Sequence, residues 1–219
     1  MIKLEYRQGV LSRGKSHFLP LLQTVERYPF PKPLNCLRLH YTYRWLKSKI
    51  TSFTGDKFLK YVEVEPEPEI HQIWVDNASQ TRLNLYIGQE GIGSSLLLRN
   101  IHPFLDNEQT KSLFLNLIQC HVSCYDATCG KDISALYGKN FSYEDRSQKL
   151  MLTWIQYLSR EVVEKWGGFV CFESNPYVQT QRIHNGLLVQ VGDNPEVFET
   201  PEGKTLLVNA INALPLIKQ

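Results

Sequence analysis

The stretch that decides the fold lies in the last third of the chain and reads Gly186-Leu187-Leu188-Val189-Gln190-Val191-Gly192. An apolar run of this length, bracketed by glycines, predicts a buried strand. The turn dipeptide Asn194-Pro195 follows, and residues 202–214 then place apolar side chains at helical spacing. Those positions are Leu206, Leu207, Ala210, Ile211 and Leu214. A second strand-like run at 150–158 is also followed by a polar-faced helix, and neither run contains a reacting group. The region therefore predicts a protein that works through its surface.

The rest of the chain alternates between strand and helix patterns. Strands are expected at 3–6, 37–44, 58–65 and 70–75, and helices at 17–28 and 107–120, the latter with Asn107 as its cap. Residues 82–87 and 94–101 predict a hairpin, because their glycine-rich connection lacks the Lys-Ser or Lys-Thr pair of a phosphate-binding loop. Residues 126–143 predict a loop with a short helical turn.

Together these patterns predict an α+β fold, with mainly antiparallel sheets and packed amphipathic helices. Residues 1–219 are expected to form a single domain, with two subdomains and a boundary near 76–81 as the alternative.

Composition and charge narrow the class of protein. Hydrophobic residues make up 42% and charged residues 21%, which is ordinary for a soluble globular chain. The net charge of +2 comes without a concentrated basic face, so neither a nucleic-acid nor a membrane partner is expected. Residues 1–6 lack the apolar stretch of a secretory leader. The cysteines are odd in number and unevenly spaced, which favours reduced thiols and a cytoplasmic location.

The candidates for catalysis and metal binding are weak. Cys120, His121, Cys124 and Cys129 form the tightest group of metal-ligand types, but their spacing is not that of paired zinc knuckles. A cysteine nucleophile would need a histidine base supplied by the fold, and no serine-hydrolase elbow or metalloprotease motif is present. We therefore expect no catalytic residues, no metal and no cofactor, and a protein that is not an enzyme.

Carboxylates and aromatic residues provide the candidates for a binding surface. Four glutamates alternate around prolines in a stiff run, and they are Glu63, Glu65, Glu67 and Glu69. Such a strip could meet a basic partner, or it could be a charged edge that prevents strand-to-strand aggregation. Asp193 and Glu196 form a second acidic patch, and Trp74 and Tyr86 are candidate aromatic anchors.

The closing third also carries a family resemblance. Its ordered features are Trp154, Tyr157-Leu158, Gly186-Leu187-Leu188-Val189, Val197-Phe198, Pro201-Glu202 and Asn209-Ala210-Ile211. In this order they resemble the immunity protein 52 family, whose members protect bacteria against toxins of polymorphic or type VI secretion systems. The resemblance covers the chain from about Leu150 onward, and Thr153 stands where a glycine is expected. A second family of type VI immunity proteins has a comparable Val-Gln-Val-Gly…Pro ending.

The resemblance implies a cytoplasmic protein that binds a cognate effector toxin and neutralises it by stoichiometric occlusion. It implies further that the toxin is a nuclease of restriction-endonuclease type and that no cofactor is needed. Two alternatives remain open: a small cytosolic enzyme with an unrecognised cysteine or carboxylate site, and an adaptor of a secretion system that assembles with itself. The oligomeric state is left open.

Overall fold

The chain divides into two compact units, residues 3–124 and residues 125–219. The structure is a computed structural model that describes residues 2–8, 15–30, 34–39, 44–62, 72–76, 84–90, 93–99, 101, 104–120, 124–131 and 133–217. The boundary considered near 76–81 begins at the last residue of a strand, and residues 77–81 lie outside the described ranges.

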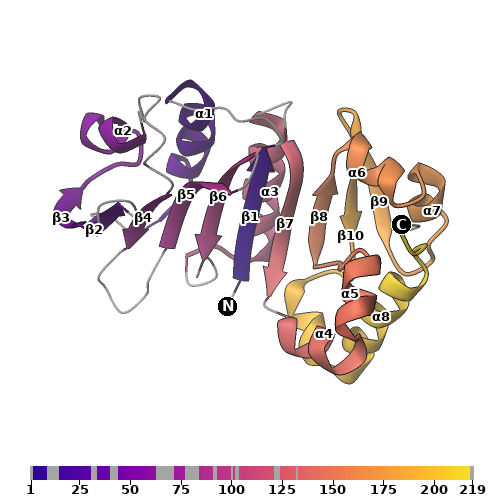
Figure 1. Ribbon diagram of the computed structural model, residues 1–219. Helices are drawn as coiled ribbons and strands as arrows, with labels where there is room; N and C mark the ends of the chain where they lie inside the picture. The colour runs from indigo at the N-terminus through magenta and orange to yellow at the C-terminus, as the bar shows by residue number, and fades with distance from the viewer. Residues whose placement is uncertain are drawn as a thin grey trace. The chain divides into compact units, whose positions relative to one another are not determined.

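The first unit is built on an antiparallel sheet with the strand order β3-β2-β4-β5-β6-β1 (Figure 1). Its strands are β1 (Ile2–Gln8), β2 (Leu34–Leu39), β3 (Arg44–Ile50), β4 (Gln72–Asp76), β5 (Asn84–Glu90) and β6 (Gly93–Arg99). Its described helices are α1 (Lys15–Glu26), α2 (Asp56–Val62) and α3 (Asn107–Cys120).

The core of this unit follows from the period of its strands and helices. Ile2, Leu4 and Tyr6 alternate along β1 and are buried, as a strand with one covered face requires. Helix α3 buries a stripe made of Leu113, Phe114, Leu117 and Ile118. Polar contacts align α1 with α3, since the Thr24 hydroxyl lies 2.8 Å from the Cys120 thiol and Asn116 donates to the Tyr28 hydroxyl at 2.8 Å.

The second unit has its own antiparallel strands, in the order β7-β8-β10-β9. They are β7 (Cys124–Lys131), β8 (Ile155–Leu158), β9 (Gln179–Ile183) and β10 (Gly186–Gln190). The helices are α4 (Ser134–Asn140), α5 (Tyr143–Gln148), α6 (Arg160–Lys165), α7 (Phe169–Glu173), the 3-10 helix η1 (Pro195–Glu199) and α8 (Pro201–Asn212).

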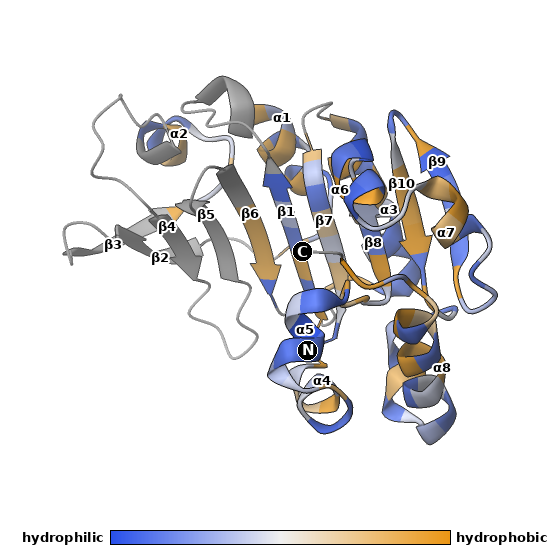
Figure 2. Ribbon diagram, turned by 45° about the vertical axis from the view of Figure 1, so that its right-hand side comes forward, coloured by the Kyte–Doolittle hydropathy of each residue, from blue (hydrophilic) through white to orange (hydrophobic). Residues whose placement is uncertain are grey.

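Burial in the second unit is concentrated on two strands. Every residue of β8 and β10 is buried, whereas β9 is largely exposed. Figure 2 shows the contrast in hydropathy, with β10 mostly hydrophobic and β9 mostly hydrophilic. Helix α6 packs against β8 and β10, α7 packs against β9, and α8 packs against η1. Helices α4, α5 and α8 gather at one end of this unit (Figure 1).

The α+β class with antiparallel pairing is confirmed. Helix α3 has the predicted bounds, β10 and α8 lie where the closing pattern places them, and β5 and β6 form the predicted hairpin. Among the described residues, none of the helices is both long and apolar enough to cross a membrane.

Several local predictions are wrong, and each has a physical reason. Residues 58–62 belong to helix α2 and not to a strand, because Leu59 N donates to the Gly55 carbonyl at 2.9 Å in a helical bond, with Asp56 in the first turn and Lys60 in the last. The cap of α3 is Asp106, whose carboxylate accepts from Gln109 N at 2.7 Å, so Asn107 is already helical.

Two longer segments also differ from expectation. The strand expected at 37–44 corresponds to the end of β2 and the start of β3, with residues 40–43 outside the described ranges. Residues 126–131 belong to strand β7, and residues 134–140 and 143–148 to helices α4 and α5, where a loop with a short helical turn was expected at 126–143. The strand forms although Asp126 and Gly130 have low strand propensity. Pairing with β8 overrides that propensity.

A buried amide tests the contact between α8 and the turn that follows α7. Asn175, only 5% exposed, donates to the Ala210 carbonyl at 2.9 Å and accepts from Tyr177 N at 3.1 Å. We expect Asn175→Ala to lower the free energy of unfolding by about 1–3 kcal/mol, because it leaves buried backbone groups without partners. Urea denaturation measures the change. The exposed Asn212→Ala, which loses a bond from Lys149, should change it by less than about 0.5 kcal/mol, and equal effects would contradict the assignment.

Candidate protein-interaction surface

The residues predicted to form a binding surface lie in different parts of the chain, and only some of them are described by the structure. Glu63, Glu65, Glu67 and Glu69 lie outside the described residues. Trp74 in β4 and Tyr86 in β5 occupy directly opposite register positions. Asp193 and Glu196 lie in the second unit, where the chain turns from β10 into α8.

This turn, residues 192–203, is called the η1 corner below, and local polar contacts define its shape. The Asn194 side chain accepts from Val197 N at 3.1 Å and caps η1, with Pro195 at its first position. The Thr200 hydroxyl donates to the Val197 carbonyl at 2.8 Å and accepts from Gly203 N at 3.1 Å. One threonine thus ends η1 and begins α8.

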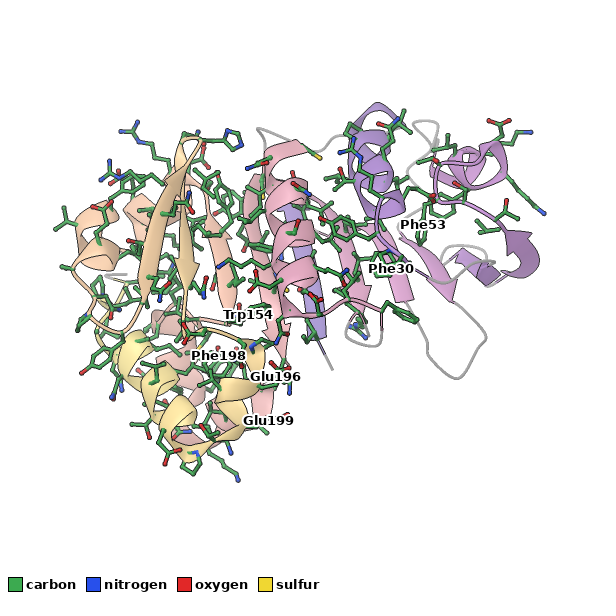
Figure 3. All side chains as sticks on the ribbon, turned by 180° about the vertical axis from the view of Figure 1, so that it is seen from behind. Phe30, Phe53, Trp154, Glu196, Phe198 and Glu199 are labelled. Carbon is green, nitrogen blue, oxygen red and sulfur yellow. The ribbon has the colours of Figure 1, made fainter. Side chains whose placement is uncertain are left out.

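The period of the 3-10 helix separates an apolar side from an acidic one. Residues three apart lie on the same side of such a helix. Pro195 and Phe198 are buried, while Glu196 is half-buried and Glu199 is exposed. Figure 3 labels both carboxylates, which lie one below the other on the same side of this corner. Two further exposed carboxylates flank η1 in the sequence, Asp193 before its cap and Glu202 in the first turn of α8. These four carboxylates are together called the acidic ridge below: Asp193, Glu196, Glu199 and Glu202.

Lys131, at the end of β7, holds the ridge to the sheet. Its ammonium lies 2.5 Å from Glu199 Oε1 and 3.7 Å from Glu196 Oε1, and its side chain is only 18% exposed. The hydrogen bond from Lys131 and its positive charge lower the pKa of Glu199. Lys204 adds a weaker attraction, yet the carboxylates still outnumber the cations, so the ridge is a negative surface.

Glycine makes the corner tight. A Cβ at Gly203 would overlap the carbonyl of Val197, so the backbone of η1 lies directly against the first turn of α8. Gly192 has a positive φ of 70°, and a Cβ there would lie 2.8 Å from Val197 Cγ1. The carboxylates are therefore presented on a backbone with little freedom.

The cysteines do not form a second candidate site in the part of the chain that the structure describes. The Cys120 thiol is hydrogen-bonded to the Thr24 hydroxyl. Cys124 and Cys129 are buried, and burial raises the pKa of the Cys129 thiol. His121 lies outside the described residues. Within those residues, no group of three histidines, cysteines or acids is arranged to hold a metal ion.

Exposed apolar residues of the second unit were not foreseen from the sequence. Tyr143 is 84% exposed at the start of α5 and Val170 is 73% exposed on α7. Tyrosine is a frequent anchor at protein interfaces. The sequence gives little warning, because short helices such as α5 and α7 have no clear apolar period.

The fold and the acidic corner together describe an α+β protein with a charged surface and no recognised catalytic arrangement among its described residues. No protein-family model matches the chain, and no curated protein matches it. Among solved structures it is similar to the Pseudomonas aeruginosa T6SS protein PA0821, where T6SS denotes the type VI secretion system. The TM-score is 0.61 at 13% sequence identity, covering 98% of this chain and 76% of the other. At that identity the similarity establishes a shared fold.

The ion pair of Lys131 can be tested by titration. We expect Lys131→Met to raise the pKa of Glu199 towards the ordinary glutamate value, whereas Lys165→Met, an exposed change on α6, should leave it unchanged. Because the folded-state pKa is the lower one, the pair stabilises the fold above the unfolded-state pKa. That stabilisation is lost as pH falls through the folded-state value. Carboxyl-detected NMR over acid pH measures both variants, and an unmoved Glu199 in Lys131→Met would show that the pair does not form.

The backbone contact at Gly203 gives a stability prediction. We expect Gly203→Ala to lower the free energy of unfolding by about 1–3 kcal/mol, because the new methyl group must displace the Val197 carbonyl. Gly138→Ala in α4 is the matched control, since nothing lies within 4 Å of its Cβ position. That control should stabilise the protein by about 0.4–1 kcal/mol. Chemical denaturation measures the free energy of unfolding of both variants. No loss of stability in Gly203→Ala would contradict the close backbone approach at Val197.

Proposed function

We propose that this chain is an immunity protein that binds a cognate effector toxin of a type VI secretion system and neutralises it. The observation that carries the proposal is the fold shared with a Pseudomonas aeruginosa T6SS protein over nearly the whole chain. The resemblance of the closing segment to the immunity protein 52 family, carried by Trp154 and by residues of β10 and the η1 corner, suggests the same function, although no family model matches the chain.

Neutralisation would be stoichiometric and would need no cofactor. The acidic ridge offers carboxylates on a backbone fixed by two caps and two glycines, so little conformational entropy is lost when a partner orders them. A basic cleft, such as the substrate-binding cleft of a nuclease, is the complementary surface. Attraction of this kind speeds encounter and fixes orientation. A nuclease target would also place the chain in the cytosol.

The decisive experiment is co-expression. The C-terminal domain of the large protein encoded by a neighbouring gene is expressed in bacteria with and without the chain, and growth and complex formation are measured. The proposal requires rescue of growth and a complex of equal stoichiometry on size exclusion. A harmless neighbour, or killing that the chain does not relieve, would overturn it. Association with apparatus components and no protection would favour the adaptor, and turnover of a small molecule would favour the enzyme.

The ridge makes a prediction about the complex. We expect the pair Asp193→Lys and Glu202→Lys to weaken effector binding by about 2–5 kcal/mol in total, with slower association, because attraction is replaced by repulsion. The control pair is Glu144→Lys and Glu161→Lys on α5 and α6. Glu161 is the second residue of α6, as Glu202 is of α8, so the loss of favourable charge at a helix start is matched. Calorimetry and surface plasmon resonance should show near-native binding for the control, and equal losses in both pairs would exclude the ridge.

A further inference from the structure

The sheet of the first unit has two unlike faces, because successive residues of a strand alternate between them. The core face is lined by alternate residues of β1 and β6 that are buried: Ile2, Leu4, Tyr6, Leu96 and Leu98. Helix α3 lies behind these strands in Figure 1 and in front of them in Figure 3, the view from behind. The opposite side is called the outer face below. Two of its residues on β1, Lys3 and Arg7, have side chains that are 40% and 51% exposed.

A row of aromatic residues crosses the outer face. Residues directly opposite each other in neighbouring strands lie on the same face of a sheet. From β3 to β1 the register partners run in the order Trp45, Arg38, Trp74, Tyr86, Leu97 and Glu5. Because strands lie about 4.8 Å apart, the row spans about 24 Å. Half of its positions are aromatic, and it is called the aromatic row below.

A parallel row carries cations. Two residues further along each strand, the register partners run in the order Lys47, Cys36, Asp76, Asn84, Arg99 and Lys3. This cation row lies about 6.6 Å from the aromatic row. Its three cations outnumber its one carboxylate. They come from distant parts of the sequence, so only strand pairing groups them, and the linear sequence shows no basic face.

The outer face as a whole keeps a positive balance. Register places five cations and three carboxylates on it: Lys3, Arg7, Arg38, Lys47 and Arg99 against Glu5, Asp76 and Glu90. Glu5 is already paired, since its carboxylate lies 2.7 Å from Lys3 Nζ and 3.1 Å from Arg7 Nε. Two cations share that one carboxylate, so the β1 end of the face stays positive.

We propose that the outer face binds a single-stranded nucleic acid, with phosphates along the cation row and bases over the aromatic row. Phosphates are held by cations along a track, and bases of any sequence stack on aromatic residues. Sheets that carry aromatic residues on one face bind splayed bases in this way. A duplex keeps its bases stacked on one another, so the aromatic row favours a single strand. An acidic protein would be attracted by the cations alone, and base stacking is what separates the two partners.

Fluorescence anisotropy tests this proposal on the full chain. The probe is a labelled single-stranded DNA of mixed sequence, about 12 nucleotides long, within the range of known single-strand sites. Its affinity should fall steeply with salt, because binding releases counterions from the phosphates. The duplex of the same sequence should bind more weakly. Intrinsic fluorescence gives a second readout. Of the four tryptophans, Trp154 and Trp166 are buried in the second unit, so quenching by the oligonucleotide would report Trp45 and Trp74.

Two sets of variants separate stacking from charge. Trp74→Leu should raise the dissociation constant at least about fivefold, because stacking on one base is lost. Tyr177→Leu, at a site 39% exposed in the second unit, is the matched control and should bind like the parent chain.

The charge variant is the pair Lys3→Gln and Arg99→Gln. It should weaken binding at low salt and flatten the salt dependence, because two phosphate contacts are lost. The pair Arg160→Gln and Lys165→Gln on α6 removes the same charge from the second unit and should leave both unchanged. Circular dichroism verifies that each variant is folded.

Absence of single-strand binding at low salt overturns the proposal, as does binding that the charge variant leaves unchanged. Polyglutamate that binds as tightly as the oligonucleotide also overturns it, since the face would then receive an acidic protein. None of these measurements uses an effector, so failure of nucleic-acid binding and failure of the immunity function are distinguished.

Discussion

The second unit depends on the burial of β8 and β10 on both faces. Every residue of these two strands is buried, and α6 packs against both of them. The two strands also bury polar residues, Gln156 in β8 and Gln190 in β10. The Gln190 amide donates to the Gly192 carbonyl at 2.8 Å. That bond joins the end of β10 to the first residue of the η1 corner. The buried strand therefore fixes where the corner, and with it the acidic ridge, begins.

The ridge shows how a surface can be rigid without being buried. Asn194 and Thr200 satisfy backbone groups at both ends of η1, and Gly203 lets the Val197 carbonyl reach the helix behind it. Phe198 and Pro195 then fix the inner side by packing. Of the carboxylates outside, Glu196 and Glu199 tie the corner to β7 through Lys131, and Glu202 adds favourable charge at the start of α8. The caps and the close approach at Gly203 keep the backbone beneath them fixed.

The sequence predicts the fold best where the apolar period of an element agrees with the glycines, prolines and caps that bound it. The α+β class, α3, β10 and α8 were all predictable on that ground. Strand β7 was not, since Asp126 and Gly130 argue against a strand and only pairing with β8 makes one. Helix α2 was missed because Phe58, Leu59 and Tyr61 favour a strand locally, while the backbone bonds to the Gly55 carbonyl that begin the helix leave no mark in the apolar pattern.

The candidate surface divides in the same way. Asp193 and Glu196 could be selected from charge and turn residues alone. Glu199 could not be joined to Glu196, because the step of three has meaning only once residues 195–199 are known to be a 3-10 helix. Glu202 could be added only once Thr200 is known to end η1 and begin α8. The position of β9 at the end of the strand order was also beyond the sequence, since that order depends on which strands pair and not on any one strand.

The charge of the acidic ridge and the backbone that carries it respond differently to salt. Under the proposed function, attraction of a basic partner is Coulombic at an exposed site, so it falls as salt shortens the Debye length to about 8 Å at physiological ionic strength. The contacts that shape the η1 corner are the caps of Asn194 and Thr200 and the close approach at Gly203, which are not ion pairs. Rising salt should therefore weaken capture of a basic partner while the backbone of the corner keeps its shape.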